Sequence, residues 1–193
     1  MLKGPFDAPS SDPPESVLWP NRHAPHSVTL QLFLIRHAIA EAESPTGRDA
    51  DRPLSSKGAE RFKVETLGLR RLGVEFDALW TSPWARAEAT GTLLTDLSKS
   101  PPKAIKDLAR PPRASLWKAI EQAEVERLAL VGHQPWLGEL ASVLASDSSD
   151  PLMGMRIKKG GLVWLEGEPQ PGRMRLEAAL PPNLLRTLGG ERD

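Results

Sequence analysis

Short apolar stretches alternate with amphipathic stretches along this chain, and this alternation constrains the fold more than any other feature. Leu30–Ile35, Phe76–Thr81 and Arg127–Val131 are apolar runs of strand length, typical of strands buried on both faces. Ser55–Leu72 instead places apolar residues at helical spacing among charged ones. Strands that alternate with helices predict an α/β fold with a mostly parallel central sheet and helices on both faces.

Further elements complete this pattern. Ser55 or Ser56 is the expected N-cap of the first helix. Ser82–Pro83 predicts the N-cap and the first residue of a helix that ends near Leu97. The remaining expected elements are a short strand at Lys103–Lys106, a helix at Ala114–Ala123, a helix from Gln134 to about Ala145, and an antiparallel edge hairpin of Leu162–Glu166 and Arg173–Glu177.

Composition bounds the domain organisation. Residues 1–28 hold prolines among serine, aspartate and asparagine, which predicts a flexible tail, and residues 29–193 are expected to form one domain. Cysteine is absent, which excludes disulfides, thiol catalysis and thiolate metal sites and fits a reducing compartment. The first 31 residues lack the features of a signal peptide, and no apolar stretch is long enough to span a bilayer. We therefore expect a cytoplasmic protein.

The charges of the chain are balanced. Lysine and arginine together number 25, as do aspartate and glutamate, so the formal net charge is zero. This balance gives no basic excess to hold nucleic acid or an anionic membrane surface. We expect a monomer that recognises its partner through a local site.

Polar clusters follow three of the expected strands. Arg36–His37 follows the first, Ser82–Arg86 the second, and Gly132–His133 the strand that ends at Val131. Because ligands of open α/β sheets bind outside the carboxyl ends of the strands, we expect these side chains to converge on one rim. Each cluster also has an ordinary explanation: an exposed strand end, a surface arginine, or a histidine that makes only a structural hydrogen bond.

Together, Arg36, His37, Arg86 and His133 suit a multiply charged anion. A guanidinium can bind two phosphate oxygens at once, an imidazole can attack phosphorus, and a second histidine can donate to the transferring group. The sequence contains no Gly-Lys-Ser/Thr phosphate loop, no paired-aspartate metal loop and no cysteine nucleophile. We therefore predict phosphoryl transfer through a phosphorylated His37, with no metal and no cofactor.

These motifs resemble those of the histidine phosphatase superfamily, which includes the cofactor-dependent phosphoglycerate mutases. Leu34–Ala38 is similar to its Arg-His-Gly motif, Ser82–Thr90 to its Ser-Pro-x-x-Arg-Ala-x-x-Thr motif, and Val131–Pro135 to its Gly-His-x-Pro motif. The order and spacing agree over roughly residues 30–180. The resemblance implies a phosphoglycerate mutase-like fold.

The resemblance also implies roles for the four residues. In this family the first histidine becomes phosphorylated, which points to His37. The two arginines and the second histidine bind the phosphoryl group, which points to Arg36, Arg86 and His133.

A narrower resemblance is to the small SixA-type phosphohistidine phosphatases. Asp51–Gly58 and Lys158–Leu162 carry it, and the chain also lacks the insertions that form a substrate lid in larger members. Gly58 in the first turn of a helix costs about 1 kcal/mol relative to alanine and therefore indicates close backbone packing.

Two positions depart from the superfamily pattern. Ala38 replaces its usual glycine. Ala109 stands where mutases and many phosphomonoesterases carry an acidic proton donor, and Asp107 is the nearest carboxylate. An alkoxide leaving group needs that proton, which contributes about 10²–10⁴-fold in rate, whereas imidazole can leave a phosphoramidate without a dedicated acid.

The missing acid favours phosphohistidine on a protein as the substrate. The expected partner is a phosphotransfer domain or a histidine kinase of a signalling relay. Two alternatives remain open: a small-molecule phosphomonoesterase that uses Asp107 or another carboxylate as its acid, and a module that binds phosphohistidine or phosphate without turnover.

Overall fold

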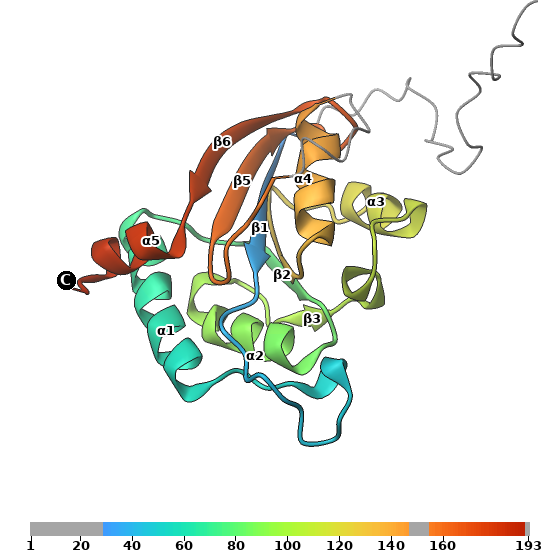
Figure 1. Cartoon of the computed structure of the whole chain (residues 1–193). Helices are drawn as coiled ribbons and strands as arrows, with labels where there is room; N and C mark the ends of the chain where they lie inside the picture. Colours follow the sequence, from blue (N-terminus) through green and yellow to red (C-terminus); the bar gives the residue numbers. More distant parts are fainter. Residues whose placement is uncertain (1–28, 147–154, 192–193) are drawn as a thin grey trace, which may run out of the picture.

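A six-stranded sheet forms the centre of the fold (Figure 1). The computed structural model describes residues 29–146 and 155–191, so the tail expected at residues 1–28 lies outside the described residues. The strands are β1 (Leu30–Arg36), β2 (Ala78–Thr81), β3 (Lys103–Ala104), β4 (Arg127–Gly132), β5 (Leu162–Gly167) and β6 (Met174–Leu180).

The strand order is β3-β2-β4-β1-β5-β6. The pairs within β3-β2-β4-β1 are parallel, whereas β5 is antiparallel to both β1 and β6. The predicted α/β class, with a mostly parallel sheet and a C-terminal antiparallel hairpin, is therefore confirmed. Within that hairpin, β6 forms the edge and β5 joins it to the parallel part.

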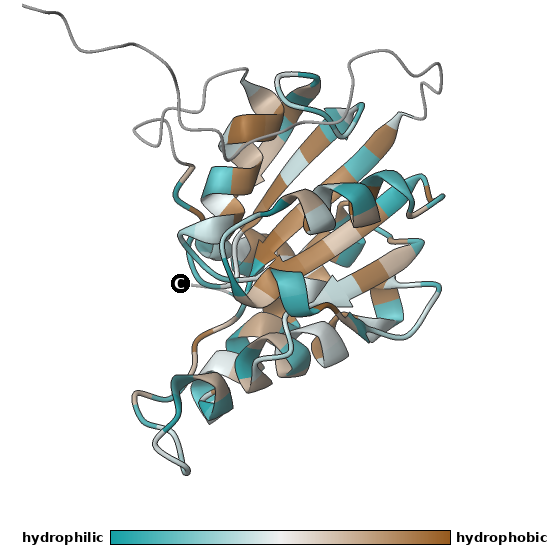
Figure 2. Ribbon diagram, turned by 90° about the vertical axis from the view of Figure 1, so that its right-hand side faces the viewer, coloured by the Kyte–Doolittle hydropathy of each residue, from teal (hydrophilic) through white to brown (hydrophobic). Residues whose placement is uncertain are grey.

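Alternate side chains of the central strands enter two separate cores. In β1, Leu32 and Leu34 belong to one core, while Phe33 and Ile35 belong to the other. This burial on both faces explains why the strands are continuous apolar runs in the sequence. Figure 2 shows it as largely brown strands between helices of mixed colour.

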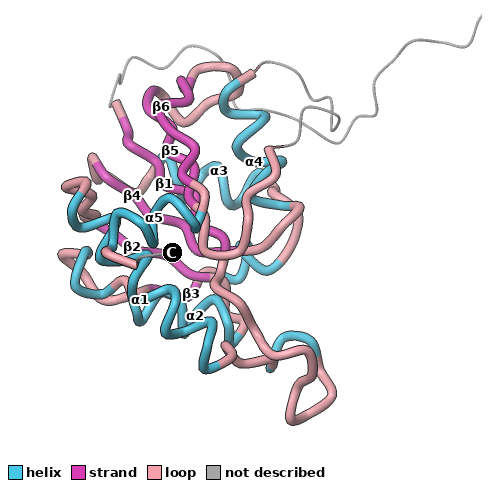
Figure 3. The backbone as a smooth tube through the Cα atoms, turned by 60° about the vertical axis from the view of Figure 1, so that its left-hand side comes forward, coloured by secondary structure: helices cyan, strands magenta, loops and turns pink. Residues whose placement is uncertain are grey.

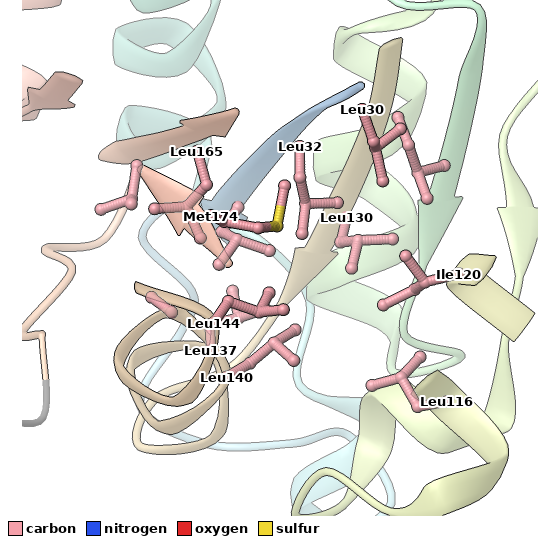
Figure 4. Close-up of a cluster of buried hydrophobic side chains, with 14 of the residues drawn as sticks. Leu30, Leu32, Leu116, Ile120, Leu130, Leu137, Leu140, Leu144, Leu165 and Met174 are labelled. Carbon is pink, nitrogen blue, oxygen red and sulfur yellow. The ribbon is translucent and has the colours of Figure 1, made fainter. Parts of the chain in front are cut away.

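Helices close both cores. They are α1 (Ser56–Arg71), α2 (Ala85–Leu93), α3 (Ala114–Glu121), α4 (Trp136–Ala145) and α5 (Pro182–Gly189). α3 and α4 cover the first core, where Figure 4 shows their apolar side chains beside those of β1 and β4. α1, α2 and α5 cover the second core. Within residues 29–146 and 155–191, no helix has the length and apolar character needed to cross a membrane.

Two helices differ from the sequence prediction. α2 begins at Ala85 with Trp84 as its N-cap, so the predicted start at Ser82–Pro83 is wrong by a few residues. Leu97 belongs to a separate 3-10 turn, Thr95–Leu97. The sequence pattern also misses α5, although a proline in its first turn is a typical start signal.

The first turn of α1 fixes the chain that follows β1. Ser55 is the N-cap, as predicted, and its Oγ accepts a hydrogen bond of 3.0 Å from the Gly58 N–H. The Ser55 N–H donates to the Ile39 carbonyl oxygen at 3.0 Å. A Cβ on Gly58 would lie 2.1 Å from that same oxygen, which confirms the close packing predicted for this glycine.

Candidate active site

The carboxyl ends of β1, β4 and β2 bring the predicted site residues together. β4 lies between β1 and β2, so the chain segments that follow these strands are neighbours. The ring centroids of His37 and His133 are 5.1 Å apart. Arg86, in the first turn of α2, places its Nε 3.2 Å from the Nε2 of His37. The predicted convergence on one rim is therefore confirmed for these residues.

His37 is buried and held as a neutral imidazole. Its Nδ1 lies 2.7 Å from the Ala38 carbonyl oxygen, and because a carbonyl only accepts, Nδ1 carries the ring proton. Nε2 keeps its lone pair and accepts from Arg86 Nε–H. Burial, together with the charges of Arg86 and Arg36, lowers the pKa of His37 from 6.5 to about 4. Nε2 is therefore unprotonated at neutral pH, and it can act as a nucleophile once it gives up the hydrogen bond from Arg86.

Arg86 uses all three of its guanidinium nitrogens. Besides the bond to His37, Nη1 donates to the backbone oxygen of Asp49 at 2.6 Å, and Nη2 donates to the Asp49 carboxylate at 2.9 Å. Asp49 lies in a 3-10 turn, Asp49–Asp51, within the connection between β1 and α1 that projects from the body of the fold (Figure 3). The hydrogen bond from Arg86 lowers the pKa of Asp49. The carboxylate is thus ionised and occupies a guanidinium that the sequence assigns to phosphate.

Thr90 of α2 links the first turn of that helix to the chain that follows His37. Thr90 Oγ1 accepts from the Ala38 N–H at 3.1 Å and donates to the Arg86 carbonyl oxygen at 2.6 Å. The Trp84 ring centroid lies 4.6 Å from Arg86 Cζ, a cation–π contact. These contacts fix the position of the guanidinium relative to the imidazole.

Arg36 approaches the site from the end of β1. Its Nη1 donates to the Ile157 carbonyl oxygen at 3.0 Å, and its Nε is buried without a hydrogen-bond partner among the described residues. Burial lowers the pKa of Arg36, and repulsion from Arg156 and Arg86 adds to this effect. The surroundings of this guanidinium therefore favour an anion.

His133 is the other buried imidazole. Its Nε2 lies 2.8 Å from Ser82 Oγ, which also accepts from the Trp84 N–H at 3.3 Å. Ser82 therefore contacts this histidine and does not cap α2 as predicted. Burial, then the neighbouring His37 and Arg86, lowers the pKa of His133 to about 3, so the ring is neutral. When Ser82 donates to Nε2, the ring proton is on Nδ1, which is buried and has no partner in the described part of the chain.

Asp107, the alternative acid, borders His133 without reaching His37 in any hydrogen bond. The two line one small pocket with Trp136 and Leu137. The Asp107 carboxylate accepts from Arg110 Nε at 2.7 Å. A hydrogen bond with Ser115, together with the Arg110 guanidinium, lowers the pKa of Asp107. The carboxyl is therefore ionised, which does not suit a proton donor.

Comparison with known proteins identifies the family. The model of the histidine phosphatase superfamily (branch 1) matches residues 32–110. An uncharacterized protein of Picosynechococcus sp. is 35% identical over 159 residues, which are 77% of this chain and 90% of that protein. The chain belongs to the histidine phosphatase superfamily.

Within this superfamily, the chain is SixA-like. Phosphohistidine phosphatase SixA of Escherichia coli is 26% identical over 129 residues, which cover 64% of this chain and 79% of that one. The structure of the protein histidine phosphatase SixA complexed with tungstate superposes with a TM-score of 0.67 at 21% identity, covering 81% of this chain and 99% of that chain. The fold expected from the sequence motifs is therefore the fold observed.

Three residues of the superfamily motifs, His37, Arg86 and His133, lie together, and Arg36 is near enough for its charge to act on both histidines. We call His37, Arg36, Arg86 and His133 the phosphate cage. It offers one nucleophilic nitrogen, two guanidinium groups and one imidazole with an unpartnered nitrogen. Such groups suit a doubly charged tetrahedral anion. Within the described ranges, no group of three or more histidine, aspartate or glutamate side chains is arranged to hold a metal ion.

Proposed function

We propose that this protein hydrolyses phosphohistidine on another protein through a phosphorylated His37. One observation carries the proposal: an unprotonated His37 Nε2 lies among cationic groups, while the neighbouring carboxylates of Asp49 and Asp107 are both held ionised. The site supplies a nucleophile and binds negative charge, but neither carboxylate is poised to donate a proton.

The first step is binding of the phosphoryl group. Arg36 and Arg86 bind its equatorial oxygens, and His133 donates from Nδ1 to the same group. Asp49 has to release Arg86 as the phosphoryl oxygens arrive. Its side chain is 56% exposed, so the carboxylate can move into solvent.

The second step is transfer to His37. A bond forms between Nε2 and phosphorus as the bond between phosphorus and the substrate imidazole breaks, and the electron pair of that bond stays on the leaving nitrogen. When the other ring nitrogen of the substrate histidine carries a proton, the leaving group is neutral imidazole and needs no dedicated acid on the enzyme, whereas an alkoxide loses about 10²–10⁴-fold in rate without one. The ionised state of Asp49 and Asp107 therefore favours phosphohistidine over phosphate monoesters.

Hydrolysis of the phosphoenzyme completes the cycle. Water attacks phosphorus, the bond from phosphorus to His37 Nε2 breaks, and inorganic phosphate leaves. The electron pair of that bond returns to Nε2, the protons of the water leave with the phosphate or pass to solvent, and Nδ1 keeps its proton throughout. The name of the SixA relative, a phosphohistidine phosphatase, supports this substrate class. A phosphotransfer domain or a histidine kinase is the partner that this class implies.

A trapping experiment tests the covalent step. The protein is mixed with a radiolabelled phosphohistidine protein, quenched in alkali, and analysed for a phosphoenzyme that is stable to base and labile to acid. We expect the label on wild type, and none on His37→Ala. His133→Ala serves as the matched control, because it removes a histidine of the phosphate cage but leaves the nucleophile, so labelling should slow and still occur at His37.

Initial rates on a phosphohistidine protein and on a panel of phosphate monoesters test the substrate class. We expect kcat/KM to be at least about 100-fold higher on phosphohistidine. Faster turnover of monoesters, lost in Asp107→Asn, would instead support the phosphomonoesterase. Tight binding of phosphohistidine without any turnover would support a binding module.

A further inference from the structure

A segment of the chain is bonded directly to the phosphate cage and does not belong to it. The Gly160 N–H donates to the carbonyl oxygens of Arg36 at 3.1 Å and of His37 at 3.3 Å. In return, Arg36 Nη1 donates to the Ile157 carbonyl oxygen at 3.0 Å. This segment is the orange chain that enters β5 beside the carboxyl end of β1 (Figure 1). Residues 156–160 are therefore fixed at the border of the site.

The exposed residues of this segment are all cationic. Ile157 is buried, whereas Arg156, Lys158 and Lys159 are exposed, and we call these three residues the basic rim. Within residues 29–146 and 155–191, none of the three forms an ion pair, although exposed arginines elsewhere do, as Arg70 does with Asp96. A chain with no net charge thus carries a local positive excess beside its active site.

The positive charges of the basic rim and of the phosphate cage repel one another. Burial lowers the pKa of Lys159, and repulsion from Arg36, Arg52 and Arg86 lowers it further. Arg156 in turn contributes to the lowered pKa of Arg36. This repulsion destabilises the protein when no anion is bound, and it is relieved when anions bind.

The phosphoryl group alone does not use all of this charge. A phosphoryl dianion is already matched by the guanidinium groups of Arg36 and Arg86. The basic rim lies outside the phosphate cage, on an exposed segment. When a substrate binds, the rim faces the part of the substrate that surrounds its phosphorylated histidine. Exposed cations in such a position act mainly by attracting an oppositely charged surface.

We propose that Arg156, Lys158 and Lys159 form a docking surface for acidic side chains of the substrate protein that flank its phosphorylated histidine. This inference rests on the proposed function, because it assigns the rim to the same substrate. It commits to carboxylates of a protein. If the basic rim instead binds a second phosphate group of a small molecule, it is a site for that molecule and not a docking surface for a protein.

Binding of matched peptides tests the docking surface without requiring turnover. The probes are two fluorescent peptides with a non-hydrolysable phosphohistidine analogue, one flanked by glutamate and the other by glutamine at the same positions. We expect wild type to bind the acidic peptide about tenfold more tightly at low salt, and most of this preference to disappear at about 0.5 M salt.

Single charge reversals locate the preference. Lys159→Glu and Arg156→Glu should each reduce the ratio of the two affinities by about three- to tenfold, because each replaces an attraction by a repulsion. Lys118→Glu is the matched control: it makes the same change at an exposed lysine of α3, and the ratio should stay at its wild-type value. A ratio is used because it cancels any change in affinity for the phosphoryl group itself.

Three results would overturn the docking surface. They are equal affinities for the two peptides, an equal effect of Lys118→Glu and Lys159→Glu, and tighter binding of a small bisphosphate than of the acidic peptide. The peptide preference is also independent of the proposed catalysis. If the protein selects the acidic peptide but hydrolyses no phosphohistidine, the docking surface stands and the proposed function fails. If it hydrolyses phosphohistidine but shows no preference for the acidic peptide, the proposed function stands and the docking surface fails.

Discussion

At the scale of single residues, phosphoryl transfer depends on the protonation state of His37. Titration followed by NMR should give its midpoint near 4, because burial and the charges of Arg86 and Arg36 lower its pKa. Arg86→Gln should raise this midpoint by about one unit, since one nearby positive charge is removed. The His37 signals are assigned by their loss in His37→Gln.

Arg110→Gln is the matched control for this titration. It removes a guanidinium that pairs with Asp107 and that does not contribute to the lowered pKa of His37. Its His37 midpoint should equal that of wild type. A wild-type midpoint near 6.5, or an equal shift in both variants, would contradict the electrostatic account of the nucleophile.

Asp49 provides a prediction about phosphate affinity. Its carboxylate is bonded to Arg86 Nη2 at 2.9 Å and competes with an incoming anion for the same guanidinium. Asp49→Ala should therefore lower the inhibition constant of inorganic phosphate by about threefold, a modest effect because the pair is partly exposed. Asp51→Ala is the control, since Asp51 pairs with Arg48 instead. Weaker phosphate inhibition in Asp49→Ala would mean that Asp49 orients Arg86 for binding.

The residue scale also separates what the sequence predicts from what it does not. His37, Arg86 and His133 are predictable because each follows an apolar strand, and parallel strands end on one side of a sheet. Asp49 is not, because it lies in a short 3-10 turn of the connection between β1 and α1, whose path to Arg86 of α2 no periodicity describes.

At the scale of helices and strands, some elements are also predictable from the sequence and others are not. The central strands are predictable because burial on both faces leaves a continuous apolar run. The prediction misplaces the start of α2 because the Ser82 hydroxyl, a good N-cap by local rules, instead contacts His133, which follows β4 and is 51 residues away in the sequence. α5 escapes prediction because it is short and is stabilised by contact with α1: a Cβ on Gly68 of α1 would lie 2.0 Å from the Leu185 carbonyl oxygen.

Gly58 allows the packing of α1 to be tested. In an ordinary helix, glycine to alanine stabilises by about 1 kcal/mol, but here the new Cβ would overlap the Ile39 carbonyl oxygen. Gly58→Ala should therefore lower the free energy of unfolding by about 1–3 kcal/mol in a denaturant titration. It should also lower kcat, because Ile39 is two residues beyond His37.

Ala59→Gly is the control for this substitution. It lies in the same helical turn and should destabilise by about 1 kcal/mol through helix propensity alone. Its kcat should stay close to that of wild type. A Gly58→Ala protein more stable than wild type would show that the chain after β1 is not held tightly against α1.

At the scale of the whole molecule, Glu65 links the helices α1 and α5 to the segment that borders the active site. It lies on α1, is 3% exposed, and accepts a hydrogen bond of 2.8 Å from Arg186 of α5. On its other side, a Cβ on Gly160 would lie 2.1 Å from the Glu65 carboxylate. The backbone that borders the phosphate cage therefore rests on a buried carboxyl. Burial raises the pKa of Glu65 from 4.5 to about 7, although the Arg186 hydrogen bond opposes the shift.

This buried carboxyl makes stability depend on pH in a defined direction. Because the pKa of Glu65 is higher in the folded state, its stabilising contribution is complete below about pH 4.5 and is lost as the pH rises to about 7. Glu65→Gln cannot ionise, so its free energy of unfolding minus that of wild type should grow over this window, by on the order of 3 kcal/mol, and then level off. Taking the difference cancels the opposite trend from His37 and His133, whose lowered pKa values reduce stability as the pH falls below 6.5.

Glu60→Gln, an exposed position on the same helix, should show a difference that is constant with pH. A constant difference for Glu65→Gln as well would mean that the folded state keeps this carboxyl as well solvated as the unfolded chain does.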